Sequence, residues 1–285
     1  MTKQLRSVLI IANTGKAGAY TIADEISDSL RRRNVEVTRF FYEGAADEVP
    51  FKDGHDLAIT LGGDGTVLFA SRVLAGHAVP ILPVNLGDFG FISEVARDEW
   101  EEALDAYIRG DIMAGPRLVL DVCVCRGDED LCAFRGLNDA VVSCDGISRM
   151  VRLDVSVSGQ HIGKYRADGV IVATPTGSTA YSVAAGGPIL HPEMDAMILN
   201  PICPFTLSHR PLVLPANEEI LITVDQHQRA GVALTVDGQS LTSLEPGDCV
   251  RVKASDRRAH IIRSNRRTFY EVLRNKLNWS GGPGD

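Results

Sequence analysis

The periodicity of apolar residues changes once along this chain of 285 residues, near residue 115, and that change limits which folds it can adopt. Before that point, short apolar runs such as Val8–Ala12 alternate with segments of helical spacing, such as Ile22, Ile26 and Leu30. Strands that alternate with helices predict a parallel sheet, whose ligands bind at the carboxyl ends of the strands. We therefore expect an α/β domain over residues 1–115.

The second part of the chain has a different pattern. From about Arg117 to Arg263, short runs rich in Val, Ile and Thr are separated by turn-forming segments such as Val236-Asp237-Gly238. Many short strands with closely spaced turns are typical of an all-β structure. We therefore expect an all-β domain over residues 116–265.

The last segment, residues 266–285, has a short apolar pattern and then a Gly/Pro-rich tail. Phe269, Val272 and Leu273 recur at helical spacing, which predicts a helix that we expect to pack back on the N-terminal domain. The tail Gly281–Asp285 is expected to be disordered. The predicted fold is thus an α/β N-terminal domain with a Rossmann-like parallel sheet, followed by an all-β C-terminal domain and a terminal helix.

Charge and composition limit the partners and the compartment. The formal net charge is −8, so neither nucleic acid nor an anionic membrane surface is expected to bind. No window approaches the about 18 apolar residues of a transmembrane helix, and the first apolar run is too short for a secretory signal. The six cysteines form no C-x-x-C pair, which favours small core side chains over a disulfide framework or a zinc site. We expect a cytoplasmic protein.

The strongest local signal is Leu61-Gly-Gly-Asp-Gly-Thr66, between a predicted strand and a predicted helix. Its glycines leave no Cβ in the way of a bulky anion, and N–H groups at a helix N-terminus can bind phosphate oxygens. Asp64 could accept a proton from an attacking hydroxyl or hold a Mg²⁺ that bridges phosphates. The structural alternative is a glycine-rich turn whose Asp caps the next helix, and this segment alone does not decide between them.

This segment resembles the diphosphate-binding turn shared by NAD kinases, by diacylglycerol and sphingosine kinases and, more loosely, by phosphofructokinases. In that group the glycines face the phosphates of the donor, and in the NAD kinases the Asp is the general base for the 2′-hydroxyl. The resemblance implies that Asp64 is catalytic and, with Gly65, also contacts NAD. It implies ATP phosphate-binding by Gly62, Gly63, Gly65 and Thr66.

A second segment, Asp168–Pro188, separates the NAD kinases from these relatives. A predicted strand at Val170–Ala173 leads into a loop of small and hydroxylated residues, which lets a ligand lie close to the backbone. Pro175 and the flanking strand argue against a flexible linker. The segment closely resembles the most characteristic NAD kinase motif, which the lipid kinases lack. The resemblance implies an NAD site lined by Asp168, Thr179, Ala180, Tyr181, Ser182, Val183 and Ala184.

A shorter resemblance lies just before another predicted strand. Asn138-Asp139 looks like the Asn-acid pair with which NAD kinases hold adenosine, the Asn near the base and the carboxylate on the ribose hydroxyls. A carboxylate can accept hydrogen bonds from two hydroxyl groups, although a β-turn Asn-Asp is the ordinary alternative. We expect both residues to bind NAD.

Further contacts follow from the same resemblance. Arg149 and Arg166 stand where the family contacts the dinucleotide, and either would supply a local cation against the negative net charge. Gln239, after Asp237-Gly238, is a further expected NAD contact. Val84–Phe91 resembles the family's Asn-x-Gly-x-Leu-Gly-Phe loop, with Phe89 where Leu is usual.

The predicted activity is transfer of a phosphoryl group from ATP to the adenosine-ribose 2′-hydroxyl of NAD, which gives NADP. ATP and NAD are the expected small-molecule partners, and Mg²⁺ or another divalent metal is expected to accompany ATP, with no ligand residue assigned. The resemblance also suggests a homodimer or homotetramer.

Two other functions are compatible with parts of the sequence. A lipid or sugar kinase could use the same phosphate turn, but the Thr174–Gly187 loop argues against it. A non-catalytic dinucleotide sensor would bind NAD without needing a phosphate-donor turn, so the intact Gly62–Gly65 segment argues against that function.

Overall fold

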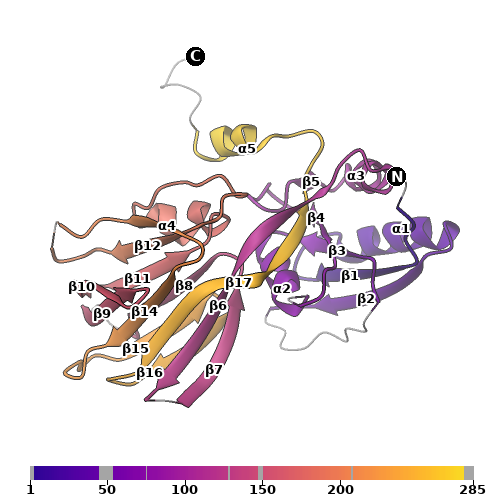
Figure 1. The fold of residues 1–285 in the computed structure, drawn as a ribbon. Helices are drawn as coiled ribbons and strands as arrows, with labels where there is room; N and C mark the ends of the chain where they lie inside the picture. Colours follow the sequence, from indigo (N-terminus) through magenta and orange to yellow (C-terminus); the bar gives the residue numbers. More distant parts are fainter. Residues whose placement is uncertain are drawn as a thin grey trace. The chain divides into compact units, whose positions relative to one another are not determined.

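The computed structural model describes residues 3–44, 54–74, 76–127, 129–146, 150–206 and 208–278. It divides into two compact units, one of Met1–Pro116 with Ala259–Asp285 and one of Arg117–Arg258 (Figure 1). An α/β N-terminal region followed by a β-rich region and a C-terminal helix, as predicted, is confirmed. The tail that was expected to be disordered lies outside the described residues.

The first unit is built on a parallel sheet in the order β4-β3-β1-β2. Two further strands pair in parallel with β4, namely β5 and, through Ile261, the end of β17. The elements are β1 (Ser7–Asn13), α1 (Ala19–Arg32), β2 (Glu36–Tyr42), β3 (Leu57–Gly62), α2 (Asp64–Val73), β4 (Ile81–Asn85), β5 (Val95–Ala96), α3 (Trp100–Arg109), β17 (Cys249–Ile262) and α5 (Phe269–Lys276).

Helices cover both faces of this sheet because side chains alternate along each strand. Val8 and Ile10 of β1 belong to a cluster that includes the apolar sides of α1 and α3. The opposite face carries Phe40, which pairs with β1, and the ring of Phe69 in α2 lies 6.1 Å from the ring of Phe40. Both faces of the sheet are therefore buried. This explains why the sequences of β1 and β3 are continuous apolar runs and do not alternate between apolar and polar residues.

The second unit is a β-sandwich. One sheet has the antiparallel order β13-β12-β11-β8-β15-β16, and the other contains β10-β9-β14-β17 with β6 and β7. The core between them is formed by side chains from both sheets, including Val142, Val172, Val155 and Ile222. The elements are β6 (Ala114–Arg126), β7 (Glu129–Gly136), β8 (Asp139–Cys144), β9 (Val151–Val157), β10 (Gln160–Ala167), β11 (Gly169–Ala173), η1 (Gly177–Thr179), α4 (Tyr181–Ala184), β12 (Ala196–Ile202), β13 (Leu212–Pro215), β14 (Glu219–Val224), β15 (Val232–Val236) and β16 (Ser240–Leu244).

The outer face of the six-stranded sheet is also apolar. Ile171 and Ala173 of β11 point away from the sandwich core and pack with Ile198 of β12 and with Leu190. Leu190 lies in the segment after α4, so the chain that follows β11 folds back over this face. The loop predicted to bind NAD is thereby seated on a rigid sheet.

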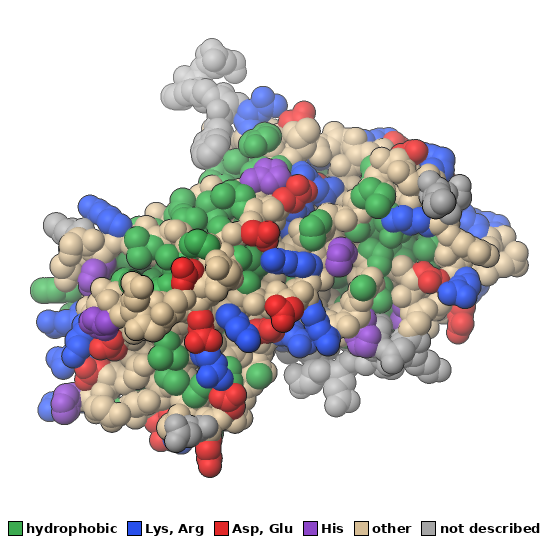
Figure 2. Space-filling view, in the orientation of Figure 1, with side chains coloured by type: hydrophobic (Ala, Val, Ile, Leu, Met, Phe, Trp, Pro, Cys, Tyr) green, Lys and Arg blue, Asp and Glu red, His purple; other side chains and the backbone are tan. Residues whose placement is uncertain are grey.

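The surface carries charges of both signs. Figure 2 shows Lys and Arg side chains interspersed with Asp and Glu on the visible face. Several form ion pairs, such as Arg258 with Asp195 at 2.9 Å. Within the described residues, no helix combines the length and the apolar character that a membrane span requires.

The sheet of the first unit offers a test of its packing. Ile59 lies at the middle of β3 and is fully buried. Replacing it with Ala is expected to lower the free energy of unfolding by about 2–5 kcal/mol, because the cavity collapses only in part. Val37→Ala on the partly exposed β2 is the matched control and should cost about 1 kcal/mol. Chemical denaturation measures both, and equal losses would contradict this core.

Candidate active site

The turn between β3 and α2 holds the glycines predicted to bind phosphate. A Cβ on Gly62 would lie 2.1 Å from Thr66 Oγ1, so close packing requires glycine there. Gly63 and Gly65 face open space, with no atom within 4 Å of an added Cβ. Thr66 is buried, and its N–H donates to the Gly63 carbonyl at 2.9 Å. Gly63 and Gly65 are thus the two predicted phosphate contacts that a ligand can approach freely.

Asp64 is the first residue of α2, but it does not cap that helix. The N-cap is Gly63, and no side chain makes a capping hydrogen bond. The carboxylate instead turns to the loop after β4, where Oδ2 accepts from the Phe91 N–H at 2.8 Å. The other oxygen, Oδ1, accepts from the N–H groups of Ile92 and Ser93, at 3.2 and 2.9 Å, and from the Ser93 hydroxyl at 2.7 Å. The capping alternative is therefore wrong, and Asp64 orders a loop 27 to 29 positions further along the chain.

The other end of this loop is held by Asn85, the last residue of β4. Its amide nitrogen donates to the Asp88 carbonyl at 2.8 Å and to the Ser93 hydroxyl at 3.0 Å. Its amide oxygen accepts from the Gly87 N–H at 2.7 Å. A Cβ on Gly90 would lie 1.7 Å from Asp64 Oδ1, so the loop touches the carboxylate too closely for any side chain at that position.

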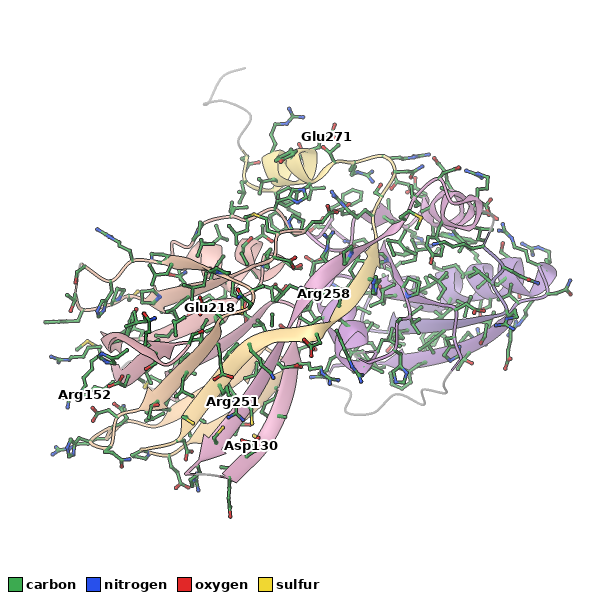
Figure 3. All side chains as sticks on the ribbon, in the orientation of Figure 1. Asp130, Arg152, Glu218, Arg251, Arg258 and Glu271 are labelled. Carbon is green, nitrogen blue, oxygen red and sulfur yellow. The ribbon has the colours of Figure 1, made fainter. Side chains whose placement is uncertain are left out.

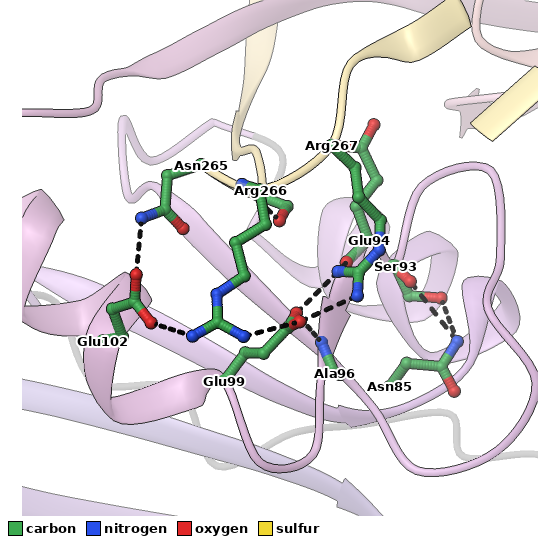
Figure 4. Close-up of polar contacts among 10 residues, drawn as sticks. Asn85, Ser93, Glu94, Ala96, Glu99, Glu102, Asn265, Arg266 and Arg267 are labelled. Atoms are coloured by element: carbon green, nitrogen blue, oxygen red, sulfur yellow. Dashed lines mark hydrogen bonds and ion pairs between the residues drawn. The ribbon is translucent and has the colours of Figure 1, made fainter. Parts of the chain in front are cut away.

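An ionic cluster joins the same loop to the C-terminal segment (Figure 4). Glu99, only 6% exposed, accepts two hydrogen bonds from Arg267, at 2.6 and 2.7 Å. Arg267 also donates to the Glu94 carbonyl and stacks on the ring of Phe89 at 4.3 Å. The hydrogen bonds from Arg267 lower the pKa of the Glu99 carboxyl. No sequence pattern indicated this pair, because its members are 168 positions apart.

In the second unit, a carboxylate again organises the backbone, this time at the predicted adenosine site. Asp237 accepts hydrogen bonds from the N–H groups of Leu137, Asn138 and Asp139, at 2.8, 2.7 and 3.1 Å. Asp237 has a φ of 53°, in the left-handed region that Asp tolerates better than most residues. The sequence located Asp237 only as part of a turn before Gln239.

The Asn138-Asp139 pair carries one unsatisfied oxygen and one carboxyl with a shifted pKa. The amide oxygen of Asn138 is buried and accepts no hydrogen bond. Asp139 is 5% exposed, and burial, with the nearby charge of Asp237, raises its pKa to about 7. Buried polar atoms normally have partners, so unsatisfied groups of this kind are typical of a ligand site.

The loop after β11 packs directly on this pair. Thr174 accepts from the Gly177 N–H at 3.0 Å, donates its hydroxyl to the Leu137 carbonyl and donates its N–H to the Asn138 carbonyl at 2.8 Å. A Cβ on Gly177 would lie 2.1 Å from that same Asn138 oxygen. Thr176 contributes a further buried hydroxyl without a partner. The two segments that the sequence assigned to NAD are thus in contact in the structure.

The remaining predicted residues of this loop differ in exposure. Ser182 is fully buried, and Asn200 donates to its carbonyl at 2.9 Å and to its hydroxyl at 3.3 Å. Tyr181 is 47% exposed, so one face of its ring can stack on a ligand. Thr179 donates to the Thr176 carbonyl. Ala180 and Val183 are partly buried and Ala184 is exposed.

Three other predicted residues lie on neighbouring strands and turns. Arg166 is exposed on β10, with its guanidinium 5.0 Å from the ring of Phe205. Asp168 and Gln239 are exposed. The predicted contact Arg149 lies outside the described residues.

The chain matches two family models in sequence. The model described as ATP-NAD kinase N-terminal domain matches residues 43–112, and the model described as ATP-NAD kinase C-terminal domain matches residues 137–264. It is 40% identical to a NAD kinase of Treponema denticola over 97% of this chain and 98% of that protein. It is 43% identical to a NAD kinase of Geobacter metallireducens over 82% of each chain.

Two solved structures share the fold. Yeast NADH kinase complexed with NADH superposes with a TM-score of 0.88 at 25% identity, covering 98% of this chain and 89% of that one. A NAD kinase from Archaeoglobus fulgidus in complex with ATP superposes with a TM-score of 0.75 at 24% identity, covering 97% of this chain and all of that one.

The raised pKa of Asp139 predicts a pH dependence of stability. Between about pH 4 and pH 7 the folded chain binds a proton here that the unfolded chain releases, so this group's contribution to stability falls as pH rises. Asp139→Asn removes that contribution, and at pH 8 it should raise the free energy of unfolding by up to about 4 kcal/mol. At pH 4 the gain should be close to zero. Denaturant titrations at both pH values measure it, and an equal change at both would contradict the buried carboxyl.

Proposed function

Because the chain belongs to the ATP-NAD kinase family, and therefore phosphorylates NAD, we propose that Asp64 is the general base for the 2′-hydroxyl of the adenosine ribose. The observation that carries this proposal is that the two carboxylate oxygens of Asp64 accept different numbers of hydrogen bonds. Oδ1 accepts three hydrogen bonds and is saturated, whereas Oδ2 accepts, among the described residues, from the Phe91 N–H alone. A carboxylate oxygen has two lone pairs, so Oδ2 retains one for a substrate hydroxyl.

The loop then acts as the support that orients the base. Four donors from Phe91–Ser93 determine the direction of the Asp64 carboxylate, so little reorganisation is needed when the hydroxyl arrives. Asp64 accepts the hydroxyl proton as the ribose oxygen attacks the γ-phosphorus of ATP, and ADP leaves. Gly63 and Gly65, at the N-terminus of α2, have open space around them and bind the donor phosphates through their backbone.

We propose that Mg²⁺ accompanies ATP and is held mainly by its phosphates. The Asp64 carboxylate is already committed to the N–H groups of its loop, which leaves it poorly suited to hold a metal as well. Among the described residues, the one group with metal-ligand spacing contains Cys123 and Asp130, and it lies in the other unit. Mg²⁺ commonly keeps its waters and binds through substrate phosphates, where it neutralises negative charge.

The NAD site of this proposal is built around two unsatisfied polar atoms and one buried carboxyl in the second unit. Asn138 Oδ1 can accept from the adenine amino group, the Thr176 hydroxyl can donate to or accept from the adenine edge, and Asp139 can accept from ribose hydroxyls. Tyr181 offers a ring for stacking and Arg166 a cation. Asp168, Thr179, Ala180, Ser182, Val183, Ala184 and Gln239 complete the proposed contacts, and Arg149 is proposed from the sequence alone.

We further propose a cytoplasmic protein that assembles as a homodimer or homotetramer. The six unpaired cysteines suit a reducing compartment. Light scattering after gel filtration measures the assembly, and a monomer would contradict it.

The direct test of the function mixes the protein with Mg²⁺, ATP and NAD and detects NADP with an NADP-specific dehydrogenase. NADP should form only when ATP is present. The same assay with NADH in place of NAD measures the specificity for the acceptor, and with polyphosphate in place of ATP it measures the specificity for the phosphoryl donor. Tight binding of NAD without product would support a sensor instead.

Asp64→Asn is expected to reduce turnover by roughly 10²-fold or more, because the amide cannot take the proton. The affinity for NAD, measured by calorimetry, should be largely retained. Near-normal turnover in this variant would remove Asp64 from the mechanism.

Two glycines of the same loop provide a matched pair. Gly90→Ala places a methyl group 1.7 Å from Asp64 Oδ1, so the carboxylate or the loop must shift. We expect at least a tenfold loss of turnover, since displacements of about 1 Å can cost 10²-fold. In Gly87→Ala the nearest atom is 3.9 Å from the added methyl, and turnover should stay within about threefold. Equal effects of the two variants would show that the loop does not position the base.

A further inference from the structure

A cluster of three thiols and a carboxylate lies in the second unit, and none of its residues is assigned to NAD or ATP. We call Cys123, Cys125, Cys249 and Asp130 the thiol cluster. Among the residues that the structure describes, Cys123, Cys125 and Asp130 form the group whose side-chain ligand atoms all lie within 4.8 Å of one another. The sequence alone favoured core roles for these cysteines, because no C-x-x-C pair is present.

The hairpin of β6 and β7 brings three of these side chains together. Cys123 and Cys125 are two positions apart on β6 and therefore point to the same face. Cys125 pairs with Asp130 of β7 across the ladder, next to a register shift at Val124. Val124 points to the opposite face and packs in the sandwich core with Cys132. Cys123, Cys125 and Asp130 thus lie on one face of the β6–β7 hairpin, and the sandwich core lies on the other.

The distances match a tetrahedral cation. The sulfurs of Cys123 and Cys125 are 3.9 Å apart, and the Cys125 sulfur is 3.2 Å from Asp130 Oδ1. Ligands at ordinary zinc distances in tetrahedral geometry would be separated by about 3.8 Å for two sulfurs and about 3.5 Å for sulfur and oxygen. The thiol of Cys249, at the start of β17, neighbours Cys125 but is not part of the group within 4.8 Å, so it would approach the ion on binding.

The charges around the cluster also suit a divalent cation. Arg251 donates to both oxygens of Asp130, at 2.9 and 3.1 Å, and so orients the carboxylate from outside (Figure 3). Ionised Cys123, Cys125 and Asp130 would carry three negative charges, which a divalent ion and Arg251 would neutralise together, and Cys249 as a fourth ligand would leave the site with one net negative charge. Residues that hydrogen-bond a metal ligand and fix its orientation, as Arg251 does for Asp130, are usual around protein metal sites.

We propose that Cys123, Cys125 and Asp130 bind one zinc ion, with Cys249 as the fourth ligand. The site links β6, β7 and β17 at the side of the sandwich and has a structural role. Asp130 is 61% exposed, so the ion can enter from solvent.

A redox pair is the competing interpretation of adjacent thiols. Residues two apart on a strand are separated by about 6.8 Å at Cα, at the upper end of the range that a disulfide spans. A metal instead needs no change in the sulfur separation. Its binding releases the two or three thiol protons, so affinity should rise with pH.

The test uses the full chain, reduced and treated with a chelator, then titrated with Co²⁺ and afterwards with Zn²⁺. One Co²⁺ per chain should bind and produce thiolate charge-transfer absorption, which Zn²⁺ abolishes by displacement. Cys125→Ser should weaken Zn²⁺ binding at least 100-fold, measured by competition with a metal indicator. Asp130→Asn changes an exposed side chain and removes no core packing, and it should weaken Zn²⁺ binding at least tenfold.

Cys132→Ser is the matched control, because this thiol lies on β7 but faces the core. It should bind Zn²⁺ as the unchanged chain does, and circular dichroism verifies that each variant is folded. Absence of the charge-transfer band, or an equal loss in Cys132→Ser, would overturn the site. A count of only four reactive thiols in the unfolded, untreated protein would identify a disulfide and would also overturn it.

Discussion

The hydrogen bonds from the backbone of residues 91–93 to the Asp64 carboxylate are the constraint on which the first half of the site depends. They join the turn after β3 to the loop after β4, two segments that end neighbouring strands of a parallel sheet. Parallel neighbours bring their carboxyl ends to one edge, which is what makes the contact possible. Asn85 and the Glu99–Arg267 pair hold the rest of the loop. The Asp64 carboxylate is therefore supported by several elements rather than by its own helix.

The second unit uses the same physical device for a different purpose. The Asp237 carboxylate accepts from three N–H groups, which fixes Asn138 and Asp139 at the start of β8. What remains there is a buried amide oxygen without a partner and a carboxyl whose pKa is raised to about 7. Burying such groups without partners costs folding free energy, and hydrogen bonds from the hydroxyl and amino groups of a ligand would offset that cost. This cost is consistent with a site formed for a dinucleotide.

Most elements were predictable because their periodicity was strong. The runs around Val8–Ala12 and Val170–Ala173 became buried strands, and the helical spacing at Ile22–Leu30 became α1. The role of Asp64 within the fold was less accessible. A Gly-Gly-Asp-Gly turn is compatible with a helix cap, and only the position of the next loop decides that the carboxylate turns away from its own helix.

By itself, the sequence determined the order of the two regions, the glycine turn and the segments that resemble an NAD site, since these depend on local spacing and residue type. Only the tertiary structure decided which backbone groups Asp64 accepts, that Thr174–Gly177 packs on Asn138, and that Arg267 pairs with Glu99. It also decided that Cys125 faces Asp130 while Cys132 faces the core. Some of these contacts join residues that are distant in the chain, and others depend on the register between strands. The local sequence pattern carries no information about chain-distant contacts or about register.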